Sequence, residues 1–96
     1  MNIPLKLKRE MDKLDIKVSN LKNKKYMTIL NNKKIHFGSK ANEHFFDSTK
    51  LKSFSEKNHG DKKRRELFYK RHYKNIMNAI DNNKITPALL SAYFLW

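Results

Sequence analysis

Apolar residues recur at spacings of three and four in the segment 62–81, and this period predicts a long amphipathic helix. Asp61 follows Gly60 and can cap the N-terminus of this helix, and the pair Asn82–Asn83 ends it. Basic side chains occupy most of the remaining positions, so one rod is expected to have a core face and a cationic face. The predicted core face consists of Tyr69, His72, Tyr73, Ile76 and Ile80, with Phe68 at its border.

A second, shorter helix is predicted at about residues 87–95, within the longest apolar run of the chain, PALLSAYFLW. Thr86 supplies an N-cap and Pro87 fits the first turn, where the N–H that proline lacks has no helical partner. This run is shorter than the roughly 20 residues that a membrane-spanning helix needs, so no membrane span is expected.

Two β-favouring runs on either side of Asn31 and Asn32 predict a β-hairpin at about residues 25–37. Asparagine tolerates the positive φ of a type I′ turn, and a two-residue turn places Tyr26 opposite Phe37. Gly38 is expected to end the second strand in a backbone conformation that other residues resist. The face predicted to lie against the core carries Tyr26, Thr28, Ile35 and Phe37.

The N-terminal residues 1–23 are predicted to be an amphipathic or assembly-ordered segment, followed by a small basic domain at 24–96. Apolar residues from Leu7 to Leu21 recur at helical spacing, whereas Ile16 and Val18 alternate with Lys17, which fits an extended strand equally well. The expected fold class is α+β. The hairpin packs on the long basic helix and the short C-terminal helix, with an N-terminal helix beside them.

The closing residues are expected to complete the core. Leu95 and Trp96 are predicted to fold back on Tyr69, Tyr73 and Ile76 and to close against the inner face of the hairpin. In this arrangement Arg71 and His72 would form hydrogen bonds to the backbone at the junction.

Residues 39–60 are mostly polar and are interpreted as a linker or surface loop. Three phenylalanines interrupt the polar sequence and are candidates for contact with a partner protein. Two of them, Phe45 and Phe46, are adjacent, and an exposed pair would favour aggregation, so we expect both to pack against the hairpin or the long helix, and contact with a neighbouring protein is the alternative. The partner-contact candidates are Phe45, Phe46 and Phe54.

The net charge of +13 on 96 residues, from 22 Lys and Arg against 9 Asp and Glu, indicates a polyanionic partner. Nucleic acid is the first candidate, since each phosphate neutralised by a basic side chain releases condensed counterions. Anionic lipid is the second. Because basic residues occur from Lys6 to Lys84, the whole surface is expected to be positive.

The cationic face of the long helix is single-signed, because Asp61 and Glu66 are the only acids between Lys57 and Ile80. Like charges four residues apart destabilise a helix unless something neutralises them, which favours contact with a polyanion or an acidic protein over a solvated face. Aromatic residues on the same helix could stack on bases, but at helical spacing they are better explained as core. The candidate nucleic-acid-binding residues are Lys62, Lys63, Arg64, Arg65, Lys70, Arg71 and Lys74, with Lys33 and Lys34 of the hairpin.

Catalysis is not predicted. The chain has no cysteine, its four histidines form no pair at metal-ligand spacing, and its two glycines make no phosphate-binding loop. The run His59-Gly60-Asp61 beside basic residues could belong to a nuclease, but a solvated or hydrogen-bonded histidine explains each of the four better. We therefore expect a non-enzymatic protein with no cofactor, no metal and no small-molecule substrate.

The order of several short motifs resembles a family of small basic proteins found in nucleocytoplasmic large DNA viruses. The resemblance covers about residues 24–96 and rests on KKY, a KKIHFG strand end, Phe46–Asp47, and the set Phe37, Gly38, Asp61, Arg65, Tyr69, Arg71, His72 and Trp96. Members of that family often carry glycine and a second tryptophan near the closing segment, where this chain has Ala88, Leu89 and Leu90. A role for a glycine turn there is therefore not carried over.

The family is of uncharacterised function, so the resemblance implies an origin in a large DNA virus more than an activity. The matched positions could define the fold as easily as a binding site. We expect the protein in the virion and, during assembly, in the host cytoplasm or viral factory. Together with the net charge of the chain, the resemblance predicts a virion component that contacts DNA without reading its sequence. The alternative is a minor capsid or core protein that bridges larger subunits through their acidic surfaces. A transcriptional regulator is disfavoured because no second helix lies at helix-turn-helix spacing.

Overall fold

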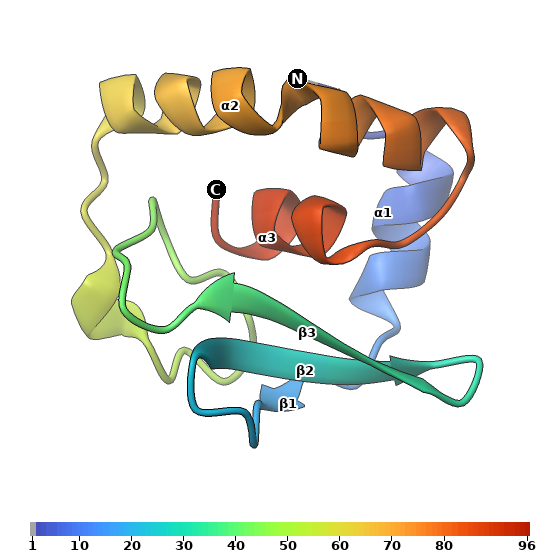
Figure 1. Cartoon of the computed structure of the whole chain (residues 1–96), viewed down its shortest axis with the longest axis horizontal. Helices are drawn as coiled ribbons and strands as arrows, with labels where there is room; N and C mark the ends of the chain where they lie inside the picture. Colours follow the sequence, from blue (N-terminus) through green and yellow to red (C-terminus); the bar gives the residue numbers. More distant parts are fainter. Residues whose placement is uncertain (1) are drawn as a thin grey trace.

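The computed structural model describes residues 2–96, which form an α+β fold in which helices cover one antiparallel sheet of order β1-β2-β3 (Figure 1). This confirms the expected fold class. The strands are β1 (Lys17–Val18), β2 (Lys24–Leu30) and β3 (Lys33–Ser39). The helices are α1 (Leu5–Asp12), α2 (Lys62–Asp81) and α3 (Pro87–Phe94), and a 3₁₀ turn lies at Ser55–Lys57.

The hairpin β2–β3 has the predicted turn, register and inner face. Asn31 and Asn32 have φ values of 52° and 65°, as a type I′ turn requires, and Tyr26 pairs with Phe37. Tyr26, Thr28 and Phe37 are buried. The strands extend slightly beyond the predicted 25–37, because Lys24 also pairs with Ser39.

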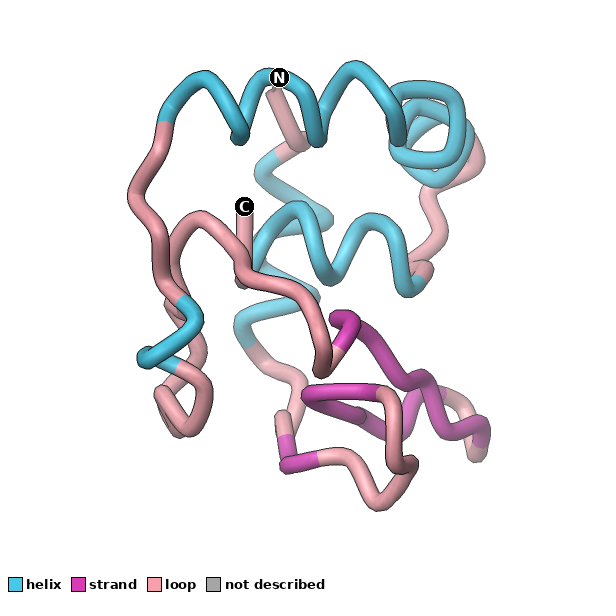
Figure 2. Tube along the Cα trace, turned by 60° about the vertical axis from the view of Figure 1, so that its left-hand side comes forward, coloured by secondary structure: helices cyan, strands magenta, loops and turns pink. Residues whose placement is uncertain are grey.

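The elements form layers, with α3 lying between α2 and the sheet (Figure 1). The turned view shows the same order, with α2 outermost and the sheet on the opposite side (Figure 2). A helix enclosed on several sides needs apolar residues all round, and α3 buries Leu89, Leu90, Ala92 and Phe94. Thr86 caps it, since its side chain accepts the N–H of Leu89 at 3.2 Å, and Pro87 occupies its first turn as predicted.

The N-terminal segment contains both a helix and a strand. The helix α1 ends at Asp12, and residues 17 and 18 are extended and pair with β2, which agrees with the extended alternative for the second half of the segment. Leu7 and Met11 of α1 are buried in the same core as the hairpin and α3. The Tyr93 hydroxyl of α3 also donates to an Asp12 carboxylate oxygen at 2.6 Å, which joins the two helices.

The long helix α2 has the predicted bounds, but its buried face is rotated relative to the prediction. Phe68, Ile76 and Ala79 are buried, whereas Tyr73 is 54% exposed and lies outside the core. The prediction was wrong here because it placed Phe68 at the border of the stripe and counted Tyr73 in it. No helix within residues 2–96 combines the length and apolarity that would let it cross a bilayer.

Leu95 and Trp96 pack against the core, but they contact different residues from those predicted. Leu95 is 1% exposed, and Trp96 stacks on Phe68 with ring centroids 4.4 Å apart and planes at 6°. Neither Arg71 nor His72 forms a side-chain hydrogen bond within the described residues, so the predicted junction bonds are absent. Gly38 lies beneath Leu95 with φ +80°, and a Cβ there would stand 2.8 Å from the Leu95 Cδ1 atom.

The segment 39–60 is part of the interior rather than the predicted linker. His44, Asp47, Thr49 and Phe54 are all buried. Backbone hydrogen bonds join it to the C-terminal residues, including Phe46 N–H to the Leu95 carbonyl at 3.1 Å. The segment therefore closes one side of the core despite its polar composition.

Candidate nucleic-acid interface

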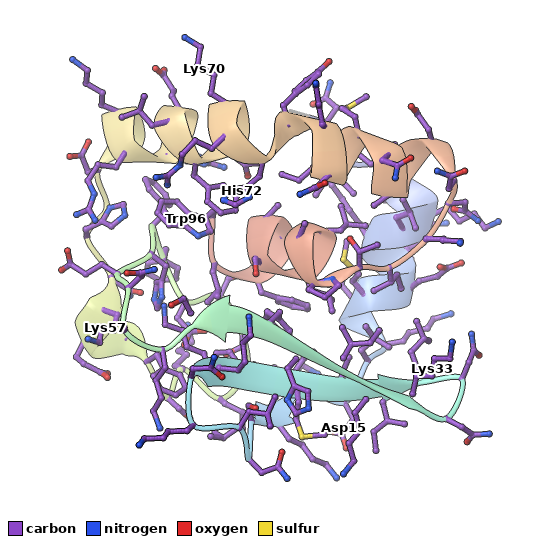
Figure 3. The ribbon with its side chains drawn as sticks, in the orientation of Figure 1. Asp15, Lys33, Lys57, Lys70, His72 and Trp96 are labelled. Carbon is purple, nitrogen blue, oxygen red and sulfur yellow. The ribbon has the colours of Figure 1, made fainter. Side chains whose placement is uncertain are left out.

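The cations of α2 stand on a rigid helix with a capped N-terminus. The Asp61 carboxylate accepts the N–H groups of Lys63 and Arg64 at 2.9 and 3.3 Å, as predicted. Lys63, Lys70 and Lys74 are exposed, and spacings of seven and four residues place them on one side of the helix, facing away from α3. Lys70 extends outward from this side (Figure 3). We call these three residues the outer lysine row.

No acidic side chain of the described residues forms an ion pair with the outer lysine row. Within residues 2–96 the only ion pairs are Arg64 with Glu43 at 3.0 Å and Lys17 with Asp15 at 3.7 Å. The Arg64 guanidinium donates a hydrogen bond to Glu43 and lowers the pKa of that carboxyl. The remaining predicted cations of α2 are exposed and form no ion pair, and Glu66 is the one carboxylate residue between Lys62 and Lys74, so this surface is strongly positive.

Arg65 differs from the other cations because it lies over aromatic rings. Its guanidinium carbon is 4.8 Å from the centre of the Phe45 ring and 5.7 Å from that of Tyr69. Such cation–π contacts fix a guanidinium without neutralising it. Arg65 therefore joins the segment 39–60 to the start of α2 and is still exposed to solvent.

A basic cleft of about 750 Å³ opens between α2, α3 and the sheet end near Gly38. Its cations are Lys24 and Lys25 of β2 with Arg64 and Arg71 of α2, and Glu43 is its one carboxylate residue. His72 and Trp96 lie near each other in the space between α2 and α3 (Figure 3). The apolar floor consists of Phe37, Phe68, Leu95 and Trp96.

The histidines near this cleft contribute little positive charge at neutral pH. Burial, together with the charge of Arg71, lowers the pKa of His72. Burial and Arg64 also lower the pKa of His59, whose Nδ1 atom accepts the Asp61 N–H at 2.9 Å. The charge of the cleft therefore comes from its lysines and arginines.

The two lysine pairs of the hairpin lie at opposite ends of the molecule. Lys24 and Lys25 reach the basic cleft, where Lys25 is almost fully buried. Lys33 and Lys34 are exposed at the hairpin tip. In Figure 3 Lys33 lies beside the hairpin tip at the lower right and Lys70 lies above α2 at the upper left, so the hairpin tip does not continue the α2 surface.

The three phenylalanines proposed as partner contacts have different environments. Phe54 is 8% exposed and packs edge-on against Tyr26 with centroids 5.2 Å apart, so it belongs to the core. Phe45 is half-buried beneath Arg65, which matches the expectation that it packs against the long helix. Phe46 is 51% exposed and has the Lys52 ammonium 5.5 Å above its ring. Phe46 is thus the one of the three that could contact a partner.

A buried polar network beneath the cleft was not predicted from the sequence. The Lys25 ammonium donates to the Asn42 carbonyl at 2.6 Å and lies 2.8 Å from His44 Nδ1. The His44 Nε2 atom lies 2.6 Å from the Asn58 side-chain oxygen, which makes Nε2 the protonated nitrogen. Burial first, and the charge of Lys25 second, lower the pKa of His44. Single residues scattered over three segments form this network, and no local spacing identifies it.

A second buried group centres on Asp47. Its carboxylate accepts hydrogen bonds from the Tyr26 hydroxyl, the Thr49 hydroxyl at 2.6 Å, and the backbone N–H groups of Thr49 and Phe54 at 3.0 and 3.2 Å. Burial alone would raise the pKa of Asp47, but these hydrogen bonds outweigh it and the pKa is lowered. A charged carboxylate therefore holds the segment 39–60 against β2.

The buried Lys25 predicts a pH-dependent stability. Burial, and then the charge of Lys57, lower its pKa from 10.5 to about 8, although Asp47 and Glu56 oppose the change. The unfolded chain then binds more protons between about pH 8 and 10.5, so the contribution of Lys25 to stability rises with pH in that window. The difference in unfolding free energy between the wild type and Lys25→Met should change with pH. From about pH 7.5 to 9.5 it should increase in favour of the wild type by about 2 kcal/mol.

This difference is measured by urea denaturation of both proteins across that pH range. Comparing the two proteins cancels the titration of tyrosines and other lysines that they share. A constant difference would show that Lys25 titrates as an exposed lysine does, and that the buried network does not perturb it.

No three His, Asp or Glu side chains in residues 2–96 gather as a metal site would require.

No protein-family model, curated protein or solved structure matches this chain.

Proposed function

We propose that this protein binds nucleic acid, most directly DNA, without reading its sequence. The observation that carries the proposal is the outer lysine row, which stands exposed on α2 with no carboxylate paired to it. Phosphate oxygens supply the missing negative charge, and the release of their counterions drives association. Lysine contacts to phosphate position a protein on DNA but carry no sequence information.

The dimensions of α2 suit this role. Its 20 residues extend about 30 Å at 1.5 Å per residue, which matches about nine base-pair steps of 3.4 Å. The inner side of the helix is fixed on α3, so only the outer side is available to a ligand. Lys62 and Arg71, which are exposed and form no ion pair, flank the outer lysine row and add further phosphate contacts. We expect about four or five phosphates to be neutralised at once.

We place this activity in the particle of a large DNA virus, on the basis of the family resemblance alone. Neutralisation of packaged DNA is a function that the charge of the chain supports there. The alternative, a bridge between larger capsid or core proteins, would use the same cations on acidic protein surfaces and is an outcome of the experiment below.

The test is binding of the purified chain to duplex DNAs of unrelated sequence, in a salt series from about 50 to 200 mM. With about five contacts, affinity should fall by about 10² to 10³-fold across the series and should not depend on sequence. The variant Lys63→Gln/Lys70→Gln/Lys74→Gln should reduce the slope of log affinity against log salt by about three.

The matched control is Lys33→Gln/Lys34→Gln, which removes exposed charge at the hairpin tip. We expect it to leave the slope close to that of the wild type, and an equal loss in both variants would indicate charge attraction without a defined surface. A wild-type chain that binds no duplex near physiological salt would contradict the proposal and favour the bridging role.

A further inference from the structure

The basic cleft combines positive charge with an apolar floor, which the outer lysine row lacks. Its walls hold the cations Lys24, Arg64 and Arg71, while its floor is apolar and includes Trp96. The one acid, Glu43, is already bound to Arg64. A duplex neutralised along α2 would not require an apolar floor, so the cleft fits a ligand that is both anionic and aromatic.

The volume of the cleft and the burial of its floor further restrict the kind of ligand that it can bind. Its volume of about 750 Å³ lies within the range of pockets that hold a small organic ligand. Phe37, Phe68 and Leu95 are buried beneath the floor, whereas Trp96 is partly exposed and is the floor residue that a ligand in the cleft can contact. A flat base fits such a floor, and the Arg71 guanidinium at the wall suits its phosphate.

We propose that the basic cleft binds one unpaired nucleotide of a single-stranded nucleic acid, with the base against the floor at Trp96 and its phosphate at Arg71 and Lys24. This inference rests on the proposed function, since the rest of the strand follows the cations of α2. A paired base reaches the floor only after it is unstacked and unpaired, which costs a few kcal/mol. The cleft therefore makes the protein prefer single strands, gaps or strand ends over intact duplex.

The only tryptophan of the chain reports directly on this cleft. Titration with a short thymidine oligonucleotide should change Trp96 fluorescence, whereas the same length of duplex should bind along α2 and leave it unchanged. An abasic oligonucleotide of equal length keeps every phosphate but has no base. It should bind about tenfold more weakly than the thymidine oligonucleotide and produce no fluorescence change.

Two single variants separate the cleft from the helix surface. Arg71→Ala removes a cation from the wall of the cleft. Lys74→Ala removes a cation of the outer lysine row, three residues farther along the same helix. Arg71→Ala should abolish the preference for the thymidine oligonucleotide over its abasic counterpart. Lys74→Ala should lower affinity for all three nucleic acids alike and keep that preference.

Each outcome decides between the two proposals. Equal binding of the thymidine and abasic oligonucleotides, or binding with unchanged Trp96 fluorescence, would overturn the nucleotide cleft and leave the duplex proposal intact. An absence of binding to single strands and duplex alike would overturn both. A fluorescence change confined to the thymidine oligonucleotide and lost in Arg71→Ala would support the cleft.

Discussion

Replacement of Asp47 by alanine is expected to lower the free energy of unfolding by about 3 to 5 kcal/mol, because several buried donors lose their acceptor at about 1 to 3 kcal/mol each. Asp47 is fully buried and accepts four hydrogen bonds, from side chains of Tyr26 and Thr49 and from two backbone N–H groups. Its loss leaves these donors unsatisfied in the interior. A chain of 96 residues has a total stability on the order of 5 to 14 kcal/mol, so the effect is large.

Urea denaturation measures this effect, and Asp61→Ala provides the comparison. Asp61 also accepts two backbone N–H groups, but it is exposed at a helix N-terminus, where the change costs about 1 kcal/mol. Equal losses in the two variants would show that the Asp47 network is open to water and that the segment 39–60 is not part of the core.

Leu95→Ala is expected to destabilise the protein by about 3 to 5 kcal/mol, because it leaves a cavity in a packed core. Leu95 is 1% exposed and packs closely over Gly38, which has no side chain to fill the space that the change leaves. Circular dichroism during thermal denaturation is a direct measurement.

The control for this prediction is Leu51→Ala. Leu51 is 47% exposed in the segment 39–60, so its replacement should change stability by no more than about 0.5 kcal/mol. A small loss at Leu95 would mean that the closing residues can separate from the sheet, and the floor of the basic cleft would then be unstable.

Local chemistry made the secondary structure predictable. Asn31 and Asn32 specify the type I′ turn, and with it the register and the inner face of the hairpin. Asp61 and Thr86 cap the two helices at the predicted positions. In each case the residues that determine the element lie within a few positions of it. The short N-terminal strand was ambiguous because its pairing with Tyr26 and Met27 is not encoded in its own residues.

The segment 39–60 could not be predicted in the same way, because its order comes from distant partners. Asp47 is held by Tyr26, and His44 by Lys25, each about 20 positions earlier in the chain. Composition identifies such residues as loop formers, and only the folded chain brings their donors and acceptors together. The same limitation placed Phe54 among the partner contacts when it is a core residue.

The candidate interface was predictable in part. The cations of α2 follow from the single-signed charge of one helix, and the structure finds them exposed. The basic cleft did not follow, because it combines Lys24 of a strand, Arg71 of a helix and Trp96 near the end of the sequence. Its walls are assembled by the packing of α3 between α2 and the sheet, which no single motif specifies.

The scarcity of ion pairs in the described residues means that added salt acts on this molecule in two opposite directions. Unpaired cations repel one another across a molecule only 30 × 28 × 20 Å in extent, and this repulsion weakens the folded state. The Debye length of about 8 Å at physiological ionic strength screens much of the repulsion, so moderate salt strengthens the fold. The same screening weakens the attraction to phosphate. A bound polyanion would also reduce the repulsion between the cations and stabilise the fold. The protein would therefore be less stable after its release from the polyanion than when bound.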